Sequence, residues 1–417
     1  MTSRRHVLKA IAAAPVVLSA ARARAAETVK IGVIYPLSGN SAAAGQECKA
    51  AAEFGADLVN NAYPQFKALP LAATAGLPNL GGAKIVLDVS DHRGNPSVAA
   101  TETLRLITQD HVVAMLGSYQ SNTAYTATAV AERYGIPFIV SDSVAANITA
   151  RGYQWTFRVT PIATNFAATY MRFLTEQQKA GHPVHSIAVV NENTDYGTSV
   201  GDAIMAAAKS TGMEVAGRIP YAASSADLST ETLRLKQLQP TVAIFVSYTS
   251  DAILYMKSMK FLNWLPPMII GDSAGFSDPS FIPAVGNLAQ GALNRSAFSA
   301  GKPGSLTYEL SRMFKSKYGY DLDDTSGRVL EAFLVLAYAI NAAGSTEPAK
   351  LQTTLRATDL KPDQLIVGYR GVRFDKTGQN VLAATDLTQL QGKQFVTVWP
   401  TDAAVAKLEW PMRGWQT

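Results

Sequence analysis

Short apolar runs alternate with longer amphipathic stretches along most of the chain. Continuous apolar runs of this length are typical of strands in a parallel sheet, because both faces of such a sheet are covered. The first part of the pattern predicts strands at 30–35, 84–89, 112–117 and 137–141, and helices at about 42–60, 96–109 and 122–134. We therefore expect an α/β unit in which helices cover both faces of a parallel sheet.

The alternation starts again after residue 185. It predicts strands at 186–191, 213–219, 242–247 and 268–271, and helices at about 196–210, 228–238 and 251–261. This is a second α/β lobe, as expected for a chain longer than one core usually serves. The segment 305–357 is mostly helical, and the tail from Gln364 is strand-like again. That order suits a chain that returns to the first lobe and then to the second.

The first residues predict an export signal. Ser3-Arg4-Arg5-His6-Val7-Leu8-Lys9 is a twin-arginine pattern, and an apolar stretch and an A-x-A spacing follow it. Residues 1–25 are therefore expected to be a cleavable signal that directs the protein to the periplasm, with twin-arginine export favoured and Sec export left open. A membrane anchor is the alternative, but eleven helical residues rise only about 16 Å, about half of the hydrocarbon thickness.

Removing this segment changes the charge of the protein. The chain has 37 basic and 32 acidic side chains, and residues 1–25 hold five of the basic ones and no acid. The remaining chain is neutral, so it has no basic stripe that would favour nucleic acid. No other apolar run is expected to span a membrane.

Seven short motifs occur in order along the chain. They are GVIYPLSG at 32–39, DHRGNP at 91–96, GSYQS at 117–121, YGIP at 134–137, RGY at 151–153, DYG at 195–197 and VSY at 246–248. Their order and spacing resemble the periplasmic branched-chain amino-acid binding proteins. The resemblance implies the type I solute-binding fold, in which three crossovers form a hinge between two Rossmann-like lobes and the ligand binds in the cleft. It places the lobes at 26–161 with 296–368, and at 162–295 with 369–417.

The resemblance also implies a function. The expected protein captures a small polar solute by closure of the cleft and presents it, as a monomer, to the membrane permease of an ABC importer. An amino acid is the first expectation. A sensing role on the same fold, or binding of amides, urea, or aromatic or short carboxylic acids, remains the alternative. Neither a cofactor nor a metal ion is expected.

Ligands of open α/β sheets bind beyond the carboxyl ends of the strands, which selects three loops. The first is 117–122, where the resemblance places the ligand carboxylate at Ser121, and where Ser118, Tyr119 and Asn122 are further candidates. Free N–H groups at the start of a helix attract anions, although Ser121 or Asn122 capping the helix is the simpler interpretation.

The second loop holds Asp142 and Ser143. The threonine of the family falls on Val144, so Ser141 or Ser143 is the expected substitute. In the third loop, Asp272 matches the acid that pairs with the ligand ammonium. The resemblance adds Tyr196 and Tyr248 from the second lobe, and Ala42–Ala44 in place of a bulky aromatic residue predicts a wider pocket.

Other patterns are weaker. Residues 271–275 fit G-x-S-x-G, but prolines follow closely and no histidine comes later in the chain, so we expect no catalytic site. The acids at 321, 323 and 324 do not complete a calcium loop and are expected to face solvent. Cys48 is expected to be a buried thiol.

Overall fold

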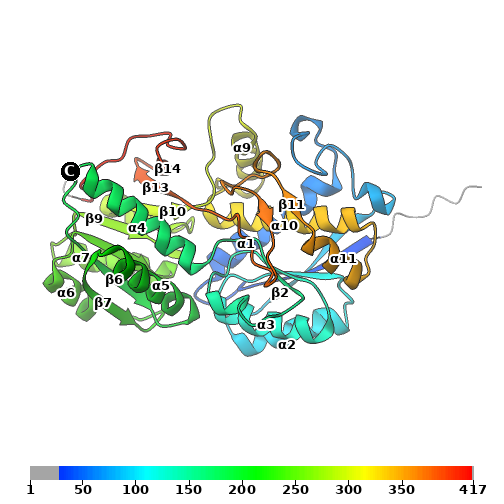
Figure 1. The fold of residues 1–417 in the computed structure, drawn as a ribbon, viewed down its shortest axis with the longest axis horizontal. Helices are drawn as coiled ribbons and strands as arrows, with labels where there is room; N and C mark the ends of the chain where they lie inside the picture. Colours follow the sequence, from blue (N-terminus) through cyan, green and yellow to red (C-terminus); the bar gives the residue numbers. More distant parts are fainter. Residues whose placement is uncertain (1–27, 416–417) are drawn as a thin grey trace, which may run out of the picture.

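The computed structural model of the chain describes residues 28–415, so the signal expected at 1–25 lies outside the described residues. Two α/β lobes lie side by side (Figure 1). Both predicted lobes are present, and most predicted strands and helices begin and end within about two residues of the observed ones.

The first lobe contains a five-stranded sheet in the order β2-β1-β3-β4-β5, and all of its strand pairs are parallel. The chain builds this part with β1 (Thr28–Tyr35), α1 (Ala42–Asn60), η1 (Pro64–Phe66), η2 (Pro78–Leu80), β2 (Lys84–Asp91), α2 (Pro96–Thr108), β3 (Ala114–Gly117), α3 (Ser121–Tyr134), β4 (Phe138–Val140), η3 (Ala146–Ile148) and β5 (Thr156–Arg158).

Alternate side chains of this sheet enter two separate cores. Ile31 and Val33 of β1 belong to the core that α1 and α10 (Asp324–Ala343) cover, whereas Ile34 belongs to the core under α2 and α3. Asn95 caps α2 as predicted, because its side chain accepts hydrogen bonds from two backbone N–H groups of the first turn and Pro96 follows it.

The second lobe contains a seven-stranded sheet in the order β14-β13-β10-β9-β8-β6-β7. Its elements are α4 (Ala163–Lys179), β6 (Ser186–Glu192), α5 (Asp195–Thr211), β7 (Glu214–Tyr221), α6 (Ser229–Leu238), β8 (Val242–Val246), α7 (Thr249–Phe261), β9 (Met268–Gly271), η4 (Ala274–Phe276), α8 (Phe281–Val285), η5 (Gly286–Ala289), β10 (Leu293–Ser296), β13 (Asp386–Gln391) and β14 (Gln394–Trp399). The strands from β6 to β10 are parallel, and the hairpin β13–β14 joins β10 in antiparallel pairing.

Between β10 and β13 the chain returns to the first lobe. This part contains α9 (Leu306–Tyr318), α10, α11 (Pro348–Arg356), η6 (Pro362–Gln364) and the small antiparallel pair β11 (Asp359–Leu360) and β12 (Val372–Arg373). The expected β tail is therefore split between the two lobes.

The cores show where the chain changes lobe. Val159 and Ala297 belong to the first core, and Ala163 and Leu293 belong to the second, from which we infer the first two crossovers near 161 and 296. Ala383 still packs in the first core, so we place the third crossover after it. We therefore infer the last limit at about 384 rather than 369.

The later crossover has a packing reason. The segment before it lies along β5, where the ring of Phe374 packs edge-on against Phe157 with centroids 5.3 Å apart. Gln379 forms an isolated bridge with Arg158 of the same strand and accepts a hydrogen bond from its guanidinium. Strand-like sequence alone did not show which sheet these residues join.

One described helix, α10, is long and apolar enough to span a membrane by length and composition alone. The sequence had led us to expect no such run. Most of this helix is buried between α1 and the first sheet. Its hydrophobicity is thus accounted for by the core of the first lobe.

Candidate ligand-binding site

A small cavity lies between the lobes at the carboxyl ends of their strands. Its walls are formed by Tyr119, Ser121, Asp142, Ser143, Val144, Tyr196, Tyr248, Ala274, Arg295 and Arg328. The loops after β3, β4, β8 and β9 each contribute to this set, as expected for an open α/β sheet. The cavity measures about 10 Å³, room for about one water, so a larger solute enters only when the lobes separate.

Ser121 lies in the first turn of α3 and lines the cavity. The N-cap residue is Gln120, and neither Ser121 nor Asn122 caps the helix. The hydroxyl of Ser121 instead accepts hydrogen bonds from the backbone N–H groups of Val144 (3.3 Å) and Ala145 (3.2 Å). Its own proton is thereby left for an acceptor in the cavity.

Two candidates of the first loop do not line the cavity. The Ser118 hydroxyl is buried between His92 Nε2 at 2.7 Å and Thr123 Oγ1 at 2.8 Å, so it holds the loop from within the lobe. Asn122 is half-buried and is absent from the cavity wall. Tyr119 does line the cavity, and its hydroxyl is buried with no partner in the described part of the chain.

Ser143 fixes the shape of the first loop. Its hydroxyl donates to the backbone carbonyls of Ser118 at 2.6 Å and Gln120 at 3.0 Å. Ser141 lies away from the cavity and hydrogen-bonds the Tyr35 hydroxyl at 2.8 Å. Val144, onto which the resemblance placed a threonine, lines the wall, and its backbone N–H donates to the Ser121 hydroxyl.

Aromatic rings from both lobes meet across the cavity. The ring of Tyr248 lies 5.9 Å from that of Tyr119 and 5.4 Å from that of Tyr196, centroid to centroid. The wider pocket predicted from Ala42–Ala44 is not found, because these residues start α1 outside the cavity wall and the three tyrosines narrow the space.

Asp272 is fully buried behind the cavity wall rather than on it. Its carboxylate accepts hydrogen bonds from Arg295 Nε at 2.9 Å, from the Tyr196 hydroxyl at 2.9 Å and from the Tyr170 hydroxyl. The structure therefore places the predicted ammonium partner in contact with groups of the protein itself.

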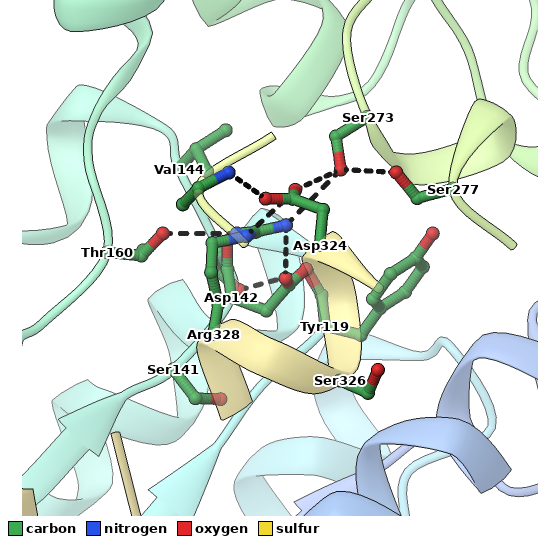
Figure 2. Close-up of polar contacts among 12 residues, drawn as sticks. Tyr119, Ser141, Asp142, Val144, Thr160, Ser273, Ser277, Asp324, Ser326 and Arg328 are labelled. Atoms are coloured by element: carbon green, nitrogen blue, oxygen red, sulfur yellow. Dashed lines mark hydrogen bonds and ion pairs between the residues drawn. The ribbon is translucent and has the colours of Figure 1, made fainter. Parts of the chain in front are cut away.

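Behind the cavity a line of ionised side chains joins the lobes. Arg295 also pairs with Asp324 at the start of α10. Asp324 pairs in turn with Arg328 one helical turn later (Figure 2). Arg328 ends the line with an N–O distance of 2.6 Å to Asp142. Burial acts to raise the pKa of Asp324, but the two guanidiniums and its hydrogen-bond donors outweigh it and the pKa is lowered. Burial raises the pKa of Asp142 to about 6 against the opposing effect of Arg328.

Arg295, Arg328 and Asp324 were missed at the level of sequence. Asp324 was expected to face solvent but is 2 % exposed, while Asp321 of the same cluster is exposed and pairs with Lys315. A signal existed, because Asp324 and Arg328 are four residues apart at the start of the most apolar helix. Charges on a helix that is otherwise buried need partners from the protein.

A larger groove lies on another side of the lobe junction. It measures about 620 Å³ and is lined by residues of α9, of the segments 276–282 and 294–301, and of the β13–β14 hairpin. Most of its wall does not come from the carboxyl ends of the strands, and none of the nine predicted ligand-binding residues belongs to it. Among residues 28–415, no group of three His, Cys, Asp or Glu side chains is suited to a metal ion.

The family model described as "Periplasmic binding protein" matches residues 28–394, nearly the whole of the two lobes. The chain belongs to this family. The periplasmic binding protein is 32 % identical over 397 residues to the Leu/Ile/Val-binding protein homolog 8 of Brucella abortus, covering 91 % of this chain and 92 % of the relative. It is 30 % identical to homolog 7 of the same organism, over 96 % of this chain and 98 % of the relative.

Solved structures show the same fold. The branched-chain amino acid transporter substrate-binding protein LivJ of Streptococcus pneumoniae, in complex with isoleucine, superposes with a TM-score of 0.75 at 18 % identity over 92 % of this chain and 100 % of that one. A solute-binding protein of Rhodopseudomonas palustris in complex with 3,4-dihydroxybenzoic acid gives 0.71 at 15 % identity, over 93 % and 99 %. The type I fold with two lobes is thus confirmed.

The family consists of solute-binding proteins rather than enzymes. In this binding protein, Ser273, the serine of the G-x-S-x-G pattern, does not have the surroundings of a catalytic nucleophile. Its hydroxyl donates to Asp324 at 2.5 Å, and the short η4 follows where a nucleophile elbow has a long helix. Cys48 is fully buried, as expected.

Proposed function

We propose that this periplasmic binding protein captures a small polar solute, an amino acid in the first place, and presents it as a monomer to the membrane permease of an ABC importer. The twin-arginine pattern at residues 3–9 supports export of the folded protein. The relatives named as Leu/Ile/Val-binding protein homologs support the solute class.

One observation carries the proposal: the cavity has walls from both lobes and groups suited to a polar solute. Ser121 has a proton to donate at the start of α3, where the partial positive charge of the helix favours a carboxylate. Tyr119 adds a buried hydroxyl without a partner in residues 28–415. Tyr248 closes the site from the second lobe.

Binding and closure are linked in this arrangement. The lobes already touch at the cavity and also through Ser199 of α5, whose hydroxyl accepts the Ala146 backbone N–H at 3.2 Å. A solute that contacts both walls stabilises the closed form by the difference between its affinities for the closed and open forms. The closed pair of lobes is then the surface that the permease recognises.

An aromatic acid is the second candidate. The protein from Rhodopseudomonas palustris holds a dihydroxybenzoic acid, and the three tyrosines of the present cavity are suited to a ring. Amides and urea remain within the same alternative.

A melting screen with the mature protein tests the proposal. Each solute that binds the folded state raises stability by RT ln(1 + [L]/Kd), about 2.7 kcal/mol at one hundred times Kd. We expect at least one α-amino acid to raise Tm in a concentration-dependent way. A response to aromatic acids alone would favour the second candidate, and no response to any small polar solute would contradict the proposal.

A further inference from the structure

The buried line of charges behind the cavity holds one more acid than base. Along the line, acid and base alternate, from Asp272 through Arg295, Asp324 and Arg328 to Asp142. All five residues are nearly or fully buried, with exposed fractions between 0 and 6 %. A buried charge without compensation is costly, so the site of the surplus negative charge matters.

The surplus does not lie at the Asp272 end. There the carboxylate receives the guanidinium of Arg295 and two tyrosine hydroxyls. Arg295 is held in addition by Phe166, whose ring centroid lies 3.7 Å from the guanidinium carbon. Asp272 itself is fully buried and absent from the cavity wall, although its partners Arg295 and Tyr196 line the cavity.

The centre of the line is also complete. Asp324 accepts from Ser273 Oγ and the Ala297 backbone N–H, both at 2.5 Å, and contacts both guanidiniums. Three of these four donors lie at Oδ2 and one lies at Oδ1, so both oxygens of Asp324 accept hydrogen bonds from the protein.

Asp142, at the other end, is incomplete. Arg328 Nη2 lies 2.6 Å from Oδ1, but no N–H of the guanidinium is directed at that oxygen, so the contact is an ion pair without a hydrogen bond. Arg328 directs its N–H groups at Asp324, Thr160, Ser273 and the backbone carbonyl of Asp142. Among the described residues, no hydroxyl or backbone N–H donates to Oδ1.

Asp142 is also the only carboxylate on the wall of the cavity in the described chain. Glu192 and Asp278, two other buried acids of the second lobe, accept hydrogen bonds from hydroxyls and backbone N–H groups and bring no cation to the line. We propose that the bound solute carries a cationic ammonium or amidinium group that completes the line at Asp142, and that Asp142 rather than Asp272 determines the specificity for it.

This inference rests on the proposed function and narrows it. A zwitterionic solute can bind both polar groups that the first lobe presents to the cavity. Its cation pairs with Asp142, and its carboxylate accepts from Ser121 and the start of α3. A purely anionic solute, such as a benzoate, brings a second negative charge to the surplus one. The two arginines on the wall do not reverse this, because each is already paired with two acids.

Two variants that remove the same charge from the same line test the inference. Asp142→Asn changes the end on the cavity, and Asp272→Asn changes the enclosed end. Titration calorimetry compares wild type and both variants with paired probes that differ in the amine, L-alanine with propionate and L-leucine with 4-methylpentanoate, and with benzoate. Melting of each variant without solute reports whether it is folded.

We expect wild type to prefer the amine of at least one pair by at least tenfold. Asp142→Asn is expected to lose that preference. Asp272→Asn is expected to retain it at a temperature at which melting shows the variant to be folded. Loss of the preference in Asp272→Asn alone overturns the inference and returns the ammonium to Asp272. If wild type binds the deaminated acids or benzoate better than the amines, the inference fails while solute binding stands. If no probe binds wild type, the proposed function and the inference fail together.

Discussion

Arg295, in strand β10 of the second lobe, lies 3.3 Å from Asp324, at the start of helix α10 in the first lobe. Neither side chain is more than 2 % exposed. The contact lies beside the crossover near residue 296, so it ties the lobes together where the chain passes between them. Its burial distinguishes it from the exposed ion pairs on α9.

Replacing Arg295 with methionine should destabilise the protein strongly. The change leaves the Asp272 carboxylate buried without a cation and removes one cation from Asp324. Breaking a buried pair in this way costs about 3–5 kcal/mol. Urea unfolding measures the loss, and Arg312→Met is a matched control because that guanidinium is 73 % exposed and its pair should contribute less than about 1 kcal/mol. Equal losses of unfolding free energy in Arg295→Met and Arg312→Met would show that the buried ion pairs of Arg295 do not stabilise the protein.

Glu331 of α10 should make stability depend on pH. It is buried, accepts one hydrogen bond from the Ile366 N–H at 2.8 Å, and burial raises its pKa to about 7. The folded state therefore holds a proton that the unfolded state releases near pH 4.5, so this contribution is complete below about pH 4.5 and is lost as the pH rises to about 7.

Glu331→Gln removes that dependence because glutamine resembles the protonated acid. At pH 8 we expect the variant to be more stable than wild type by on the order of 1–3 kcal/mol, with a gain that shrinks toward pH 4.5. Asp142 and Asp386 also have pKa values raised to about 6, so they too make the stability of wild type depend on pH. The measurement is therefore the difference in the free energy of unfolding between Glu331→Gln and wild type at each pH. A gain that does not vary with pH would contradict the assignment.

Ser121→Ala should weaken solute binding. The variant loses the hydroxyl that faces the cavity and leaves the Val144 and Ala145 backbone N–H groups without their acceptor. We expect about tenfold weaker binding, equal to about 1.4 kcal/mol, measured by titration calorimetry. Thr101→Ala on the exposed face of α2 is the control, and an affinity equal to that of the control would remove Ser121 from the site.

Tyr248→Ala should change which solutes fit. Its ring fills the space between Tyr119 and Tyr196, so truncation enlarges a cavity that now has room for about one water. We expect small solutes to bind several-fold more weakly and bulkier ones to gain relative to them in the melting screen. Tyr134→Ala, an exposed position at the end of α3, should leave the ranking unchanged. A ranking that is also unchanged in Tyr248→Ala would show that the ring does not shape the site.

Local patterns predicted the elements and the loops of the site well. The apolar runs of β1, β3 and β8 and the Asn95–Pro96 start of α2 are signals carried by neighbouring residues. Six of the nine candidate ligand-binding residues line the cavity, because the carboxyl ends of parallel strands meet at one edge of a sheet.

The parts that depend on distant contacts were not predictable in the same way. Arg158 and Gln379 are 221 positions apart, and their pairing is one of the distant contacts from which we infer a late last crossover. Asp272 had the residue type expected for an ammonium partner, but its partners Tyr170 and Arg295 come from other elements. Buried charges are paired through the fold, so residue type alone does not say which acid remains available to a solute.

The structure of the complex with the best amino acid from the melting screen tests the account most directly. The account predicts the solute between the lobes, with its carboxylate at Ser121 and its ammonium at Asp142, and with the Tyr248 ring closing over it. A solute bound instead in the larger groove along α9 and the β13–β14 hairpin would contradict the account, as would an ammonium paired with Asp272.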